Sequence, residues 1–312
     1  MVRPSMNAPA GFPLDEYHAL RSGFGCVDLA DWTSITLSGR DRQTFLNNFC
    51  TNDVKRLQPG ERCEVFITNV KGKILAHGLV DCRADELVLI TVPGQAERLI
   101  AHLDRYIIRE DVQLRNSTAE RKYFLIAGGD AAGGGLTHDR WIHWRILEVP
   151  ICGLIEAPVD QFLTILGELR ADGARPCGAA ALQSLRVESG MPLYGSDFDE
   201  ENLPQEIGRD EEAISFTKGC YLGQETVARI DALGHVNQQL VGVRWAGPDI
   251  PVAGQELMSN GTPAGRITTI TYSPQLEAPL ALAILRRNWA APGTKLSSPA
   301  GPCEVIDLPL FS

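Results

Sequence analysis

From Gly234 onwards the chain is a succession of short apolar runs separated by glycine and proline residues. Apolar segments of this length, bounded by turn-forming residues, predict β-strands rather than helices. The runs cover residues 240–245, 256–258, 265–271, 280–285 and 303–308. A series of short strands with turn signals between them is typical of a small barrel. We therefore expect a domain boundary at residues 232–238 and a C-terminal β-barrel domain over residues 236–312.

Helical and strand patterns are mixed before this boundary. Strands are predicted at residues 34–37, 63–68, 74–80, 86–92, 112–114, 123–127, 141–149 and 152–156, and helices at 42–49, 95–106, 160–171 and 179–187. This mixture predicts the α+β class, with residues 1–235 forming two α+β units that divide near residue 115. The glycine-rich stretch 128–135 lacks the spacing of a dinucleotide-binding motif and is expected to be a surface loop.

The charge balance argues against a broad nucleic-acid or membrane surface. The chain of 312 residues has a net charge of -10, whereas binding to phosphates needs clustered Lys and Arg. The apolar runs are far shorter than the roughly 20 residues that span a bilayer. Residues 1–20 fit neither a secretory signal nor a transit peptide. We expect a cytoplasmic protein, or a mitochondrial matrix protein if the source is eukaryotic, with no direct contact to nucleic acid or membrane.

The eight cysteines are dispersed, and none forms a Cys-x-x-Cys pair. This distribution predicts reduced thiols, most of them buried as small apolar side chains. Neither the cysteines nor the histidines have the spacing of metal ligands, so no metal site is expected.

One cysteine has a different setting, in the segment Lys218–Glu225. Cys220 follows a lysine and a glycine and precedes a predicted helix that begins at Gln224. A nearby ammonium group and a helix N-terminus both favour the thiolate form, so this thiol is expected to ionise more easily than a free one. Gly219 is expected to give the backbone the freedom that the turn needs. The segment therefore predicts a reactive cysteine.

Three blocks of sequence, taken together, resemble one protein family. They are Lys218–Glu225, Arg186–Gly195, and Thr51–Val54 followed by Lys71–Lys73. Their order and spacing are similar to those of folate-binding proteins related to the glycine-cleavage T-protein. Within that superfamily, the form Lys-Gly-Cys-Tyr-x-Gly-Gln-Glu resembles the YgfZ branch and its relatives in mitochondrial iron–sulfur assembly.

The resemblance implies a three-domain cloverleaf around a central channel, with tetrahydrofolate or a related folate as the cofactor. It also implies a role as an accessory protein that supports the assembly or repair of iron–sulfur enzymes, including those that modify tRNA. The expected partners are therefore iron–sulfur enzymes or assembly factors, besides the folate itself.

The resemblance also assigns roles to individual residues. Cys220 matches the signature cysteine, and Trp32 matches a tryptophan that stacks on folate. Glu188 stands where T-proteins use a carboxylate, which can pair with the adjacent N–H donors of a pterin. A second folate-contacting tryptophan of the family corresponds to Leu182, which cannot stack in the same way. The motif residues around the thiol are Lys218, Gly219, Tyr221, Gly223, Gln224 and Glu225.

Two other functions are consistent with the sequence. The first is a tetrahydrofolate-dependent aminomethyl or methyl transferase. T-proteins carry an aspartate just after the hairpin at residues 70–73, but here residues 74–77 contain no carboxylate, and Asp81 lies about 13 Å further along a strand. A general base must lie within about 3 Å of its proton, so this reaction is disfavoured. The second is a non-catalytic scaffold with a vestigial pocket, which the leucine at 182 supports.

Overall fold

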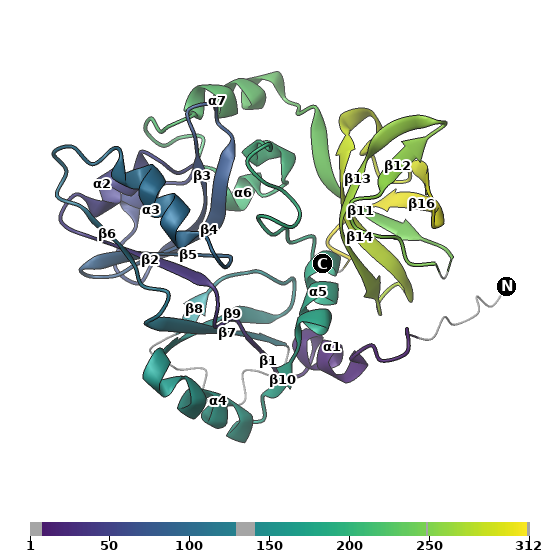
Figure 1. The fold of residues 1–312 in the computed structure, drawn as a ribbon, viewed down its shortest axis with the longest axis horizontal. Coiled ribbons are helices and arrows are strands. Elements are labelled where there is room, and N and C mark those ends of the chain that lie inside the picture. The colour runs from purple at the N-terminus through teal and green to yellow at the C-terminus, as the bar shows by residue number, and fades with distance from the viewer. Residues whose placement is uncertain (1–7, 129–140, 248, 311–312) are drawn as a thin grey trace. The chain divides into compact units, whose positions relative to one another are not determined.

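The computed structural model describes residues 8–128, 141–247 and 249–310. The chain forms two compact units, each built from separate stretches of sequence (Figure 1). Unit 1 contains Met1–Asp28, Tyr123–Pro192 and Asn237–Ser312, and unit 2 contains Leu29–Lys122 and Leu193–Val236. Most of the glycine-rich stretch 128–135, which we expected to be a surface loop, lies outside the described residues.

Unit 2 is built on a five-stranded antiparallel sheet with the order β3-β4-β5-β2-β6. The strands are β2 (Thr33–Ser38), β3 (Arg62–Thr68), β4 (Ile74–Cys82), β5 (Glu86–Thr91) and β6 (Gln113–Asn116). Residues 69–73 turn the chain between β3 and β4, as the hairpin pattern predicts. Every residue of β4 is buried, which explains why this strand lacks an alternating polar face.

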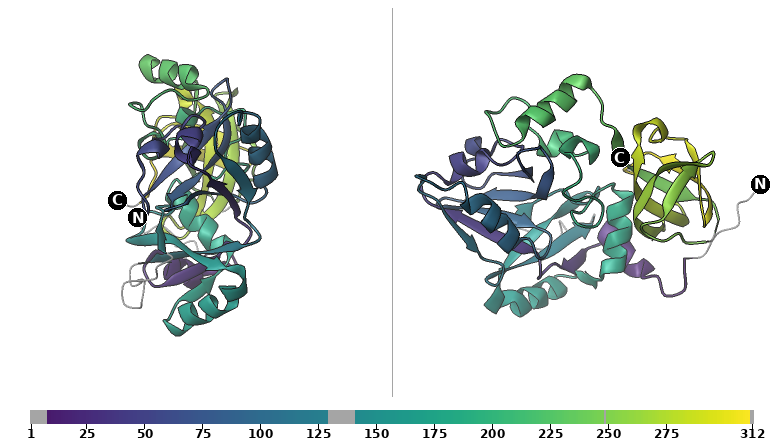
Figure 2. Two further views of the ribbon diagram at one scale, coloured as in Figure 1. Left: turned by 90° about the vertical axis from the view of Figure 1, so that its left-hand side faces the viewer. Right: turned by 45° about the horizontal axis from the view of Figure 1, so that its top comes forward.

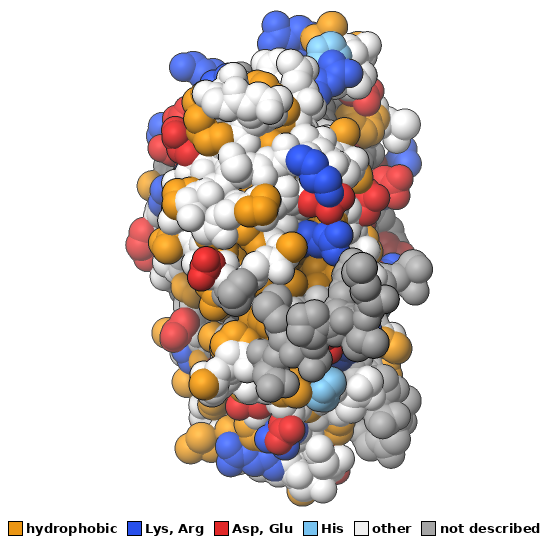
Figure 3. Space-filling model, turned by 90° about the vertical axis from the view of Figure 1, so that its right-hand side faces the viewer, with side chains coloured by type: hydrophobic (Ala, Val, Ile, Leu, Met, Phe, Trp, Pro, Cys, Tyr) orange, Lys and Arg blue, Asp and Glu red, His pale blue; other side chains and the backbone are white. Residues whose placement is uncertain are grey.

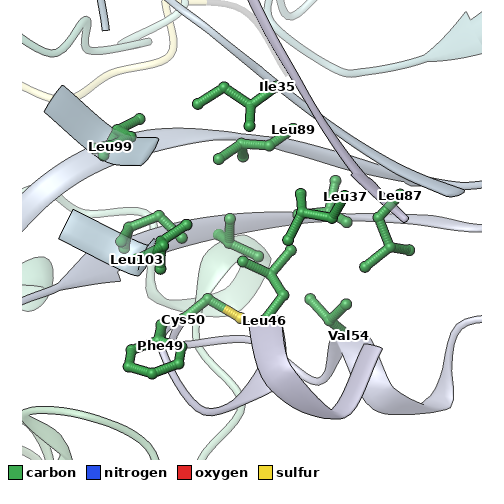
Figure 4. Close-up of a cluster of buried hydrophobic side chains, with 14 of the residues drawn as sticks. Ile35, Leu37, Leu46, Phe49, Cys50, Val54, Leu87, Leu89, Leu99 and Leu103 are labelled. Atoms are coloured by element: carbon green, nitrogen blue, oxygen red, sulfur yellow. The ribbon is translucent and has the colours of Figure 1, made fainter. Parts of the chain in front are cut away.

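Two helices, α2 (Arg42–Asn47) and α3 (Ala96–Asp104), and the short 3₁₀ turn η1 (Val54–Arg56) contribute to the main core of unit 2. The apolar side chains of α2 and α3 point toward those of β2 and β5 (Figure 4). In α3, Leu99 and Leu103 are four residues apart and therefore lie on one face of the helix; both are fully buried.

The second stretch of unit 2 contains η4 (Pro204–Glu206), α6 (Asp210–Ala213) and α7 (Gln224–Leu233). A smaller apolar cluster joins this stretch to β3 and β4. Its members are Phe66, Ile74, Phe198, Ile207, Ala213, Ile214, Tyr221 and Val227. Residues 188–214 show no clear hydrophobic periodicity in the sequence. In the structure they are mostly loop, with the two short helical turns η4 and α6.

Unit 1 contains a second five-stranded sheet, with the order β10-β1-β7-β9-β8. The strands are β1 (Gly25–Asp28), β7 (Arg121–Gly128), β8 (Trp141–His143), β9 (Ile151–Pro158) and β10 (Arg175–Cys177). Helix α4 (Phe162–Ala171) follows the 3₁₀ turn η3 (Val159–Gln161) and covers this sheet with Ile165 and Leu169 (Figure 1). The predicted strand at 141–149 was too long, because β8 ends at His143 and an irregular segment reaches β9.

The C-terminal part of unit 1 is a closed barrel with the strand order β11-β14-β13-β12-β15-β16 (Figure 2). The strands are β11 (Gln238–Trp245), β12 (Glu256–Ser259), β13 (Thr262–Ser273), β14 (Ala278–Arg286), β15 (Lys295–Ser298) and β16 (Gly301–Ile306), with η5 (Arg287–Trp289) after β14. The expectation of an α+β protein with a C-terminal barrel is confirmed. Strand β15 was not predicted, because its four residues carry little apolar signal.

Helices α1 (Leu14–Arg21) and α5 (Ala179–Glu188) complete unit 1. Helix α5 lies against the barrel strand β13, where the hydroxyls of Ser184 and Thr271 are 2.6 Å apart. The amide of Gln183 donates to the carbonyl oxygen of Ile270 at 2.9 Å in the same contact. These bonds fix the middle of α5 beside the barrel.

Acidic, basic and apolar side chains are interspersed on the face drawn in Figure 3. Among the described residues, no helix combines the length and the apolar character that crossing a bilayer requires.

Candidate functional site

The segment that carries the predicted reactive thiol is tied to unit 2 by backbone hydrogen bonds on both sides of Cys220. Upstream, the N–H of Ser215 donates to the carbonyl oxygen of Thr51 at 2.9 Å. Downstream, the N–H of Leu222 donates to the carbonyl oxygen of Asn48 at 2.8 Å. Because both anchors lie on residues 48–51, just after α2, the intervening residues form a loop held at both ends against one turn.

Lys218 points into the protein and contributes to the same anchor. Its ammonium group donates to the carbonyl oxygens of Asn47, Cys50 and Asn52 at 2.6, 2.7 and 2.8 Å. The side chain is buried, and the ammonium lies 4.9 Å from the centroid of the Tyr221 ring. Since carbonyls at the end of a helix lack intrahelical donors, the lysine satisfies the end of α2. We expected this ammonium group to favour the thiolate form of Cys220. In the structure, its hydrogen bonds instead give Lys218 a structural role.

The glycine that the loop requires is Gly223 rather than Gly219. Gly223 has φ +85°, and a Cβ there would lie 2.4 Å from the carbonyl oxygen of Asn69. Gly219 has no positive φ and open space around it. The expected conformational freedom at Gly219 is therefore not used. Gly223 instead lets the start of α7 pack directly against the β3–β4 hairpin.

Cys220 is exposed, and the seven other thiols of the chain are buried or partly buried. Helix α7 begins at Gln224, as predicted, so the thiol lies four residues before the helix. The helix dipole acts mainly within the first turn, which leaves Cys220 outside its strongest influence. The role of Cys220 as a reactive group remains a prediction, and its exposure meets the first requirement.

Tyr221 contributes to the anchor rather than to an open surface. It is buried with Phe66 and Val227 in the smaller core of unit 2. Burial, together with the neighbouring Cys50 thiol, raises the pKa of the Tyr221 phenol well above its usual value. Gln224 caps a turn by donating its N–H to the carbonyl oxygen of Tyr221 at 3.1 Å, whereas Glu225 is exposed in the first turn of α7.

Trp32, the predicted stacking residue, lies in the turn that leads into β2 of unit 2. The backbone N–H of Trp32 donates to the carbonyl oxygen of Leu29 at 3.0 Å, and 9% of the residue is exposed. Most of the indole is therefore covered by protein. Its contact with a folate remains a prediction.

Glu188, the predicted pterin-binding carboxylate, belongs to unit 1 and is fully buried. It accepts hydrogen bonds from the phenol of Tyr17 at 2.6 Å, from the Ser273 hydroxyl, and from the N–H of Gln275 at 3.2 Å. Burial raises the pKa of this carboxyl, and the hydrogen bonds oppose the rise. The carboxylate thus links α1, α5 and the barrel, and its contact with a pterin remains a prediction.

Leu182 lies on α5 of unit 1, six residues before Glu188, and is partly buried. An aliphatic side chain at this position offers contact area but no aromatic face.

Unit 2 contains a buried ion cluster at the place where the sequence lacks the T-protein aspartate. The ring of His77 lies 2.7 Å from the carboxylate of Glu64, which also accepts two hydrogen bonds from Arg209 at 2.9 and 2.8 Å. Burial alone would raise the pKa of Glu64, but His77 and Arg209 together hold it well below its usual range. Asp81, the next carboxylate on β4, pairs with Arg62 and Arg83.

The sequence analysis did not predict the hydrogen-bonding partners of the buried carboxylates of Glu64 and Glu188. Glu64 was the more detectable, since a charged residue within the apolar strand 63–68 requires a buried partner. Its partner Arg209 lies 145 positions away in the chain, which no local pattern indicates. Tyr17 lies 171 positions from Glu188. Among the described residues, no group of three or more His, Cys, Asp or Glu side chains is placed to hold a metal ion.

Comparisons with known proteins agree with the fold. Residues 5–133 match the family of the GCVT N-terminal domain, and residues 238–311 match the family of the glycine cleavage T-protein C-terminal barrel domain. The glycine cleavage system aminomethyltransferase T from Bartonella henselae has a similar fold, with a TM-score of 0.84 at 20% identity over 96% of this chain and 89% of that chain.

Similar curated proteins extend over nearly the whole chain. An aminomethyltransferase of Synechococcus sp. is 29% identical over 90% of this chain and 84% of its own length. An aminomethyltransferase of Nostoc sp. is 25% identical over 95% of this chain and 87% of its own length. The two family matches together cover more than half of the sequence, one in its N-terminal part and the other over the C-terminal barrel. The chain therefore belongs to the superfamily of the glycine-cleavage T-protein.

Proposed function

We propose that this protein binds tetrahydrofolate and acts as a folate-dependent member of the T-protein superfamily. The observation that carries this proposal is the similarity to aminomethyltransferases over 90% and 95% of the chain. T-proteins use tetrahydrofolate as the acceptor of a one-carbon unit, so a chain with both of their domains is expected to keep a site for this cofactor. Trp32 and Glu188 are the candidate contacts.

The names of the relatives favour transfer of an aminomethyl or other one-carbon group as the reaction. Such a transfer needs a base close to the reacting nitrogen of the folate. Residues 74–77 supply no carboxylate, and Glu64 and Asp81 are both held in ion pairs. A transferase built on this chain would therefore draw its base from another residue. Formation of methylenetetrahydrofolate from an aminomethyl donor and tetrahydrofolate tests this function.

A second candidate is the YgfZ-type role, in which the protein supports iron–sulfur enzymes. The exposure of Cys220 on a loop anchored at both ends favours it. A single thiolate cannot hold a cluster that needs about four ligands. Any contact of Cys220 with iron or a cluster would therefore be shared with a partner protein, and an exposed thiol suits such a contact.

Two measurements separate these candidates. In cells that lack the native gene, the Cys220→Ala variant should lose the support of iron–sulfur enzyme activity and of tRNA modification if the accessory role is correct. Cys63→Ala, which changes a partly buried thiol in the same unit, serves as the control. Equal function of Cys220→Ala and wild type, with methylenetetrahydrofolate formed in vitro, would establish the transferase and reject the accessory role.

The non-catalytic scaffold gives a third pattern in the same assays. In that case function in cells would not depend on tetrahydrofolate. Substitutions of Trp32 or Glu188 that leave the protein folded would also leave its function in cells unchanged.

A further inference from the structure

The imidazole ring of His77, on β4 of unit 2, is held in one orientation by its neighbours. Its Nε2 lies 2.7 Å from a carboxylate oxygen of Glu64. The ring of Phe66 stacks on it with the centroids 4.8 Å apart, and the ring of Phe198 approaches edge-to-face with the centroids 5.9 Å apart. Only 4% of His77 is exposed. A ring with a hydrogen bond at one nitrogen and aromatic contacts on its sides cannot turn freely.

Glu64 determines which ring nitrogen of His77 carries the proton. Against the effect of burial, His77 and Arg209 hold the pKa of the Glu64 carboxyl well below its usual range. An ionised carboxylate can only accept hydrogen bonds, so His77 donates to it through Nε2. In the neutral imidazole the other nitrogen, Nδ1, is then an acceptor. Among the described residues, none donates a hydrogen bond to Nδ1 of His77.

The strand register places His77 at the same end of the sheet as Trp32, the candidate folate contact in this unit. Thr91 of β5 pairs with Thr33 of β2 on one side and with Gly78 of β4 on the other. Trp32 and His77 directly precede Thr33 and Gly78, so both lie one position beyond this row. Two strand spacings separate them, about 10 Å, which one bicyclic heterocycle can bridge.

We propose that His77 is the residue of unit 2 that recognises the reduced state of the folate, with Nδ1 accepting a hydrogen bond from the pterin N5–H. Reduction of the pterin adds this N–H, and a one-carbon unit on N5 replaces it. An acceptor at this position therefore selects the form that is ready to receive a one-carbon unit. Glu64 is a positioning residue, because it fixes the imidazole without touching the ligand. The inference rests on the proposed function and extends it to the choice between folate forms.

The experiment compares ligands with and without the N5–H. Tetrahydrofolate, 5-methyltetrahydrofolate and dihydrofolate are titrated anaerobically by calorimetry at about pH 8, where an ordinary histidine is neutral. The last two lack the N5–H for different reasons, a methyl group in one and a C=N bond in the other. The wild type should bind tetrahydrofolate about tenfold more tightly than either, as expected for one hydrogen bond in a buried site. Equal binding of the three ligands would overturn the inference.

Two substitutions separate recognition of the ligand from the structural role of His77. His77→Gln keeps a donor that can reach Glu64 but has no acceptor at the position of Nδ1, so it should lose the preference for tetrahydrofolate. His77→Asn places an amide oxygen near the position of Nδ1 but is too short to reach Glu64, so it should keep most of the preference. His102→Gln, which changes the buried histidine on α3 of the same unit, is the control and should keep all of it.

A purely structural role of His77 predicts a different pattern in the same titrations. His77→Asn, which breaks the hydrogen bond to Glu64, would then weaken the binding of all three ligands, and His77→Gln would leave every affinity unchanged. That pattern would overturn the inference.

Nitrogen-15 NMR of the imidazole gives a readout that is independent of affinity. The free protein should contain His77 as the Nε2–H tautomer, and tetrahydrofolate should shift the Nδ1 resonance, whereas 5-methyltetrahydrofolate should not. An Nδ1–H tautomer would contradict the inference even if the folate binds. If the wild type binds no folate, the proposed function fails together with the inference. If the wild type binds tetrahydrofolate and its preference survives in His77→Gln, only the inference fails.

Discussion

The phenol of Tyr17 donates a 2.6 Å hydrogen bond to the carboxylate of Glu188, and both residues are completely buried. This bond joins the first helix of unit 1 to the end of α5, 171 positions away in the chain. A buried carboxylate is stable only when it is hydrogen-bonded, so each donor to Glu188 contributes to the stability of the fold.

Removal of the Tyr17 hydroxyl should destabilise the protein. Tyr17→Phe leaves the ring packing intact but withdraws one donor from a buried carboxylate, at an expected cost of about 1–3 kcal/mol. Urea denaturation followed by circular dichroism would measure this change. Tyr106→Phe is a suitable control, because Tyr106 is partly buried and its ring packs against Phe49. An equal change in the two variants would contradict the importance of the Glu188 network.

Gly219 and Gly223, which lie on either side of Cys220, should respond very differently to substitution by alanine. Gly223→Ala places a Cβ 2.4 Å from a backbone oxygen at a positive φ, and should destabilise the protein by about 2–4 kcal/mol. Gly219→Ala meets open space and should change the stability by less than about 1 kcal/mol. Thermal denaturation of both variants checks this contrast. Similar melting temperatures would show that the loop does not pack as described.

The thiols should divide sharply by their reactivity. In the native protein, Ellman's reagent should modify Cys220 first, because it is exposed while the others are buried or partly buried. Burial raises the pKa of several of them, including those of Cys50 and Cys152, each to about 11, so these thiols should react only after unfolding. The rapid phase should disappear in Cys220→Ala. A rapid phase that persists in this variant would place the reactive thiol elsewhere.

Asp210 should make the stability of unit 2 depend on pH. Burial and the nearby charges of Asp231 and Glu212 raise its pKa from 3.8 to about 6, and its buried Oδ1 has no hydrogen-bond partner. The folded state therefore favours the neutral acid. The resulting stability is fully present below pH 3.8 and is lost as the pH rises through about 6.

Asp210→Asn should therefore be more stable than the wild type at pH 7.5, by about 1 kcal/mol once partial solvent screening is allowed for. The two proteins should become similar near pH 4. Asp85→Asn, in the exposed turn between β4 and β5, should have little effect at either pH. A constant difference between Asp210→Asn and the wild type from pH 4 to 7.5 would rule out this titration.

The sequence predicted the local elements better than the contacts between them. The strands around the 70–73 hairpin, α3 and most barrel strands follow from apolar periodicity, which is a local property. Strands β1 and β10 were missed because they have only four and three residues and are defined by pairing with strands distant in the sequence, β1 with β7 and β10, and β10 with β1. The strand predicted at 141–149 was too long, because buried side chains after β8, such as Trp144 and Leu147, lie on an irregular segment.

The candidate site shows the same limit. The motif around Cys220 correctly indicated a helix that begins at Gln224, because spacing and residue type are visible in the sequence. The direction of the Lys218 side chain was not visible, since its acceptors lie 166–171 positions earlier in the chain. The partners of Glu188 were hidden for the same reason. Recognition of the family supplied candidate residues, but only the structure could say what each side chain contacts.

The most direct test of the account is an anaerobic calorimetric titration of the wild-type protein with tetrahydrofolate. The account predicts saturable binding at one site per chain, with weaker binding in Trp32→Ala. Absence of saturable binding by a folded, monodisperse wild-type protein would contradict the claim that this member of the superfamily works with a folate.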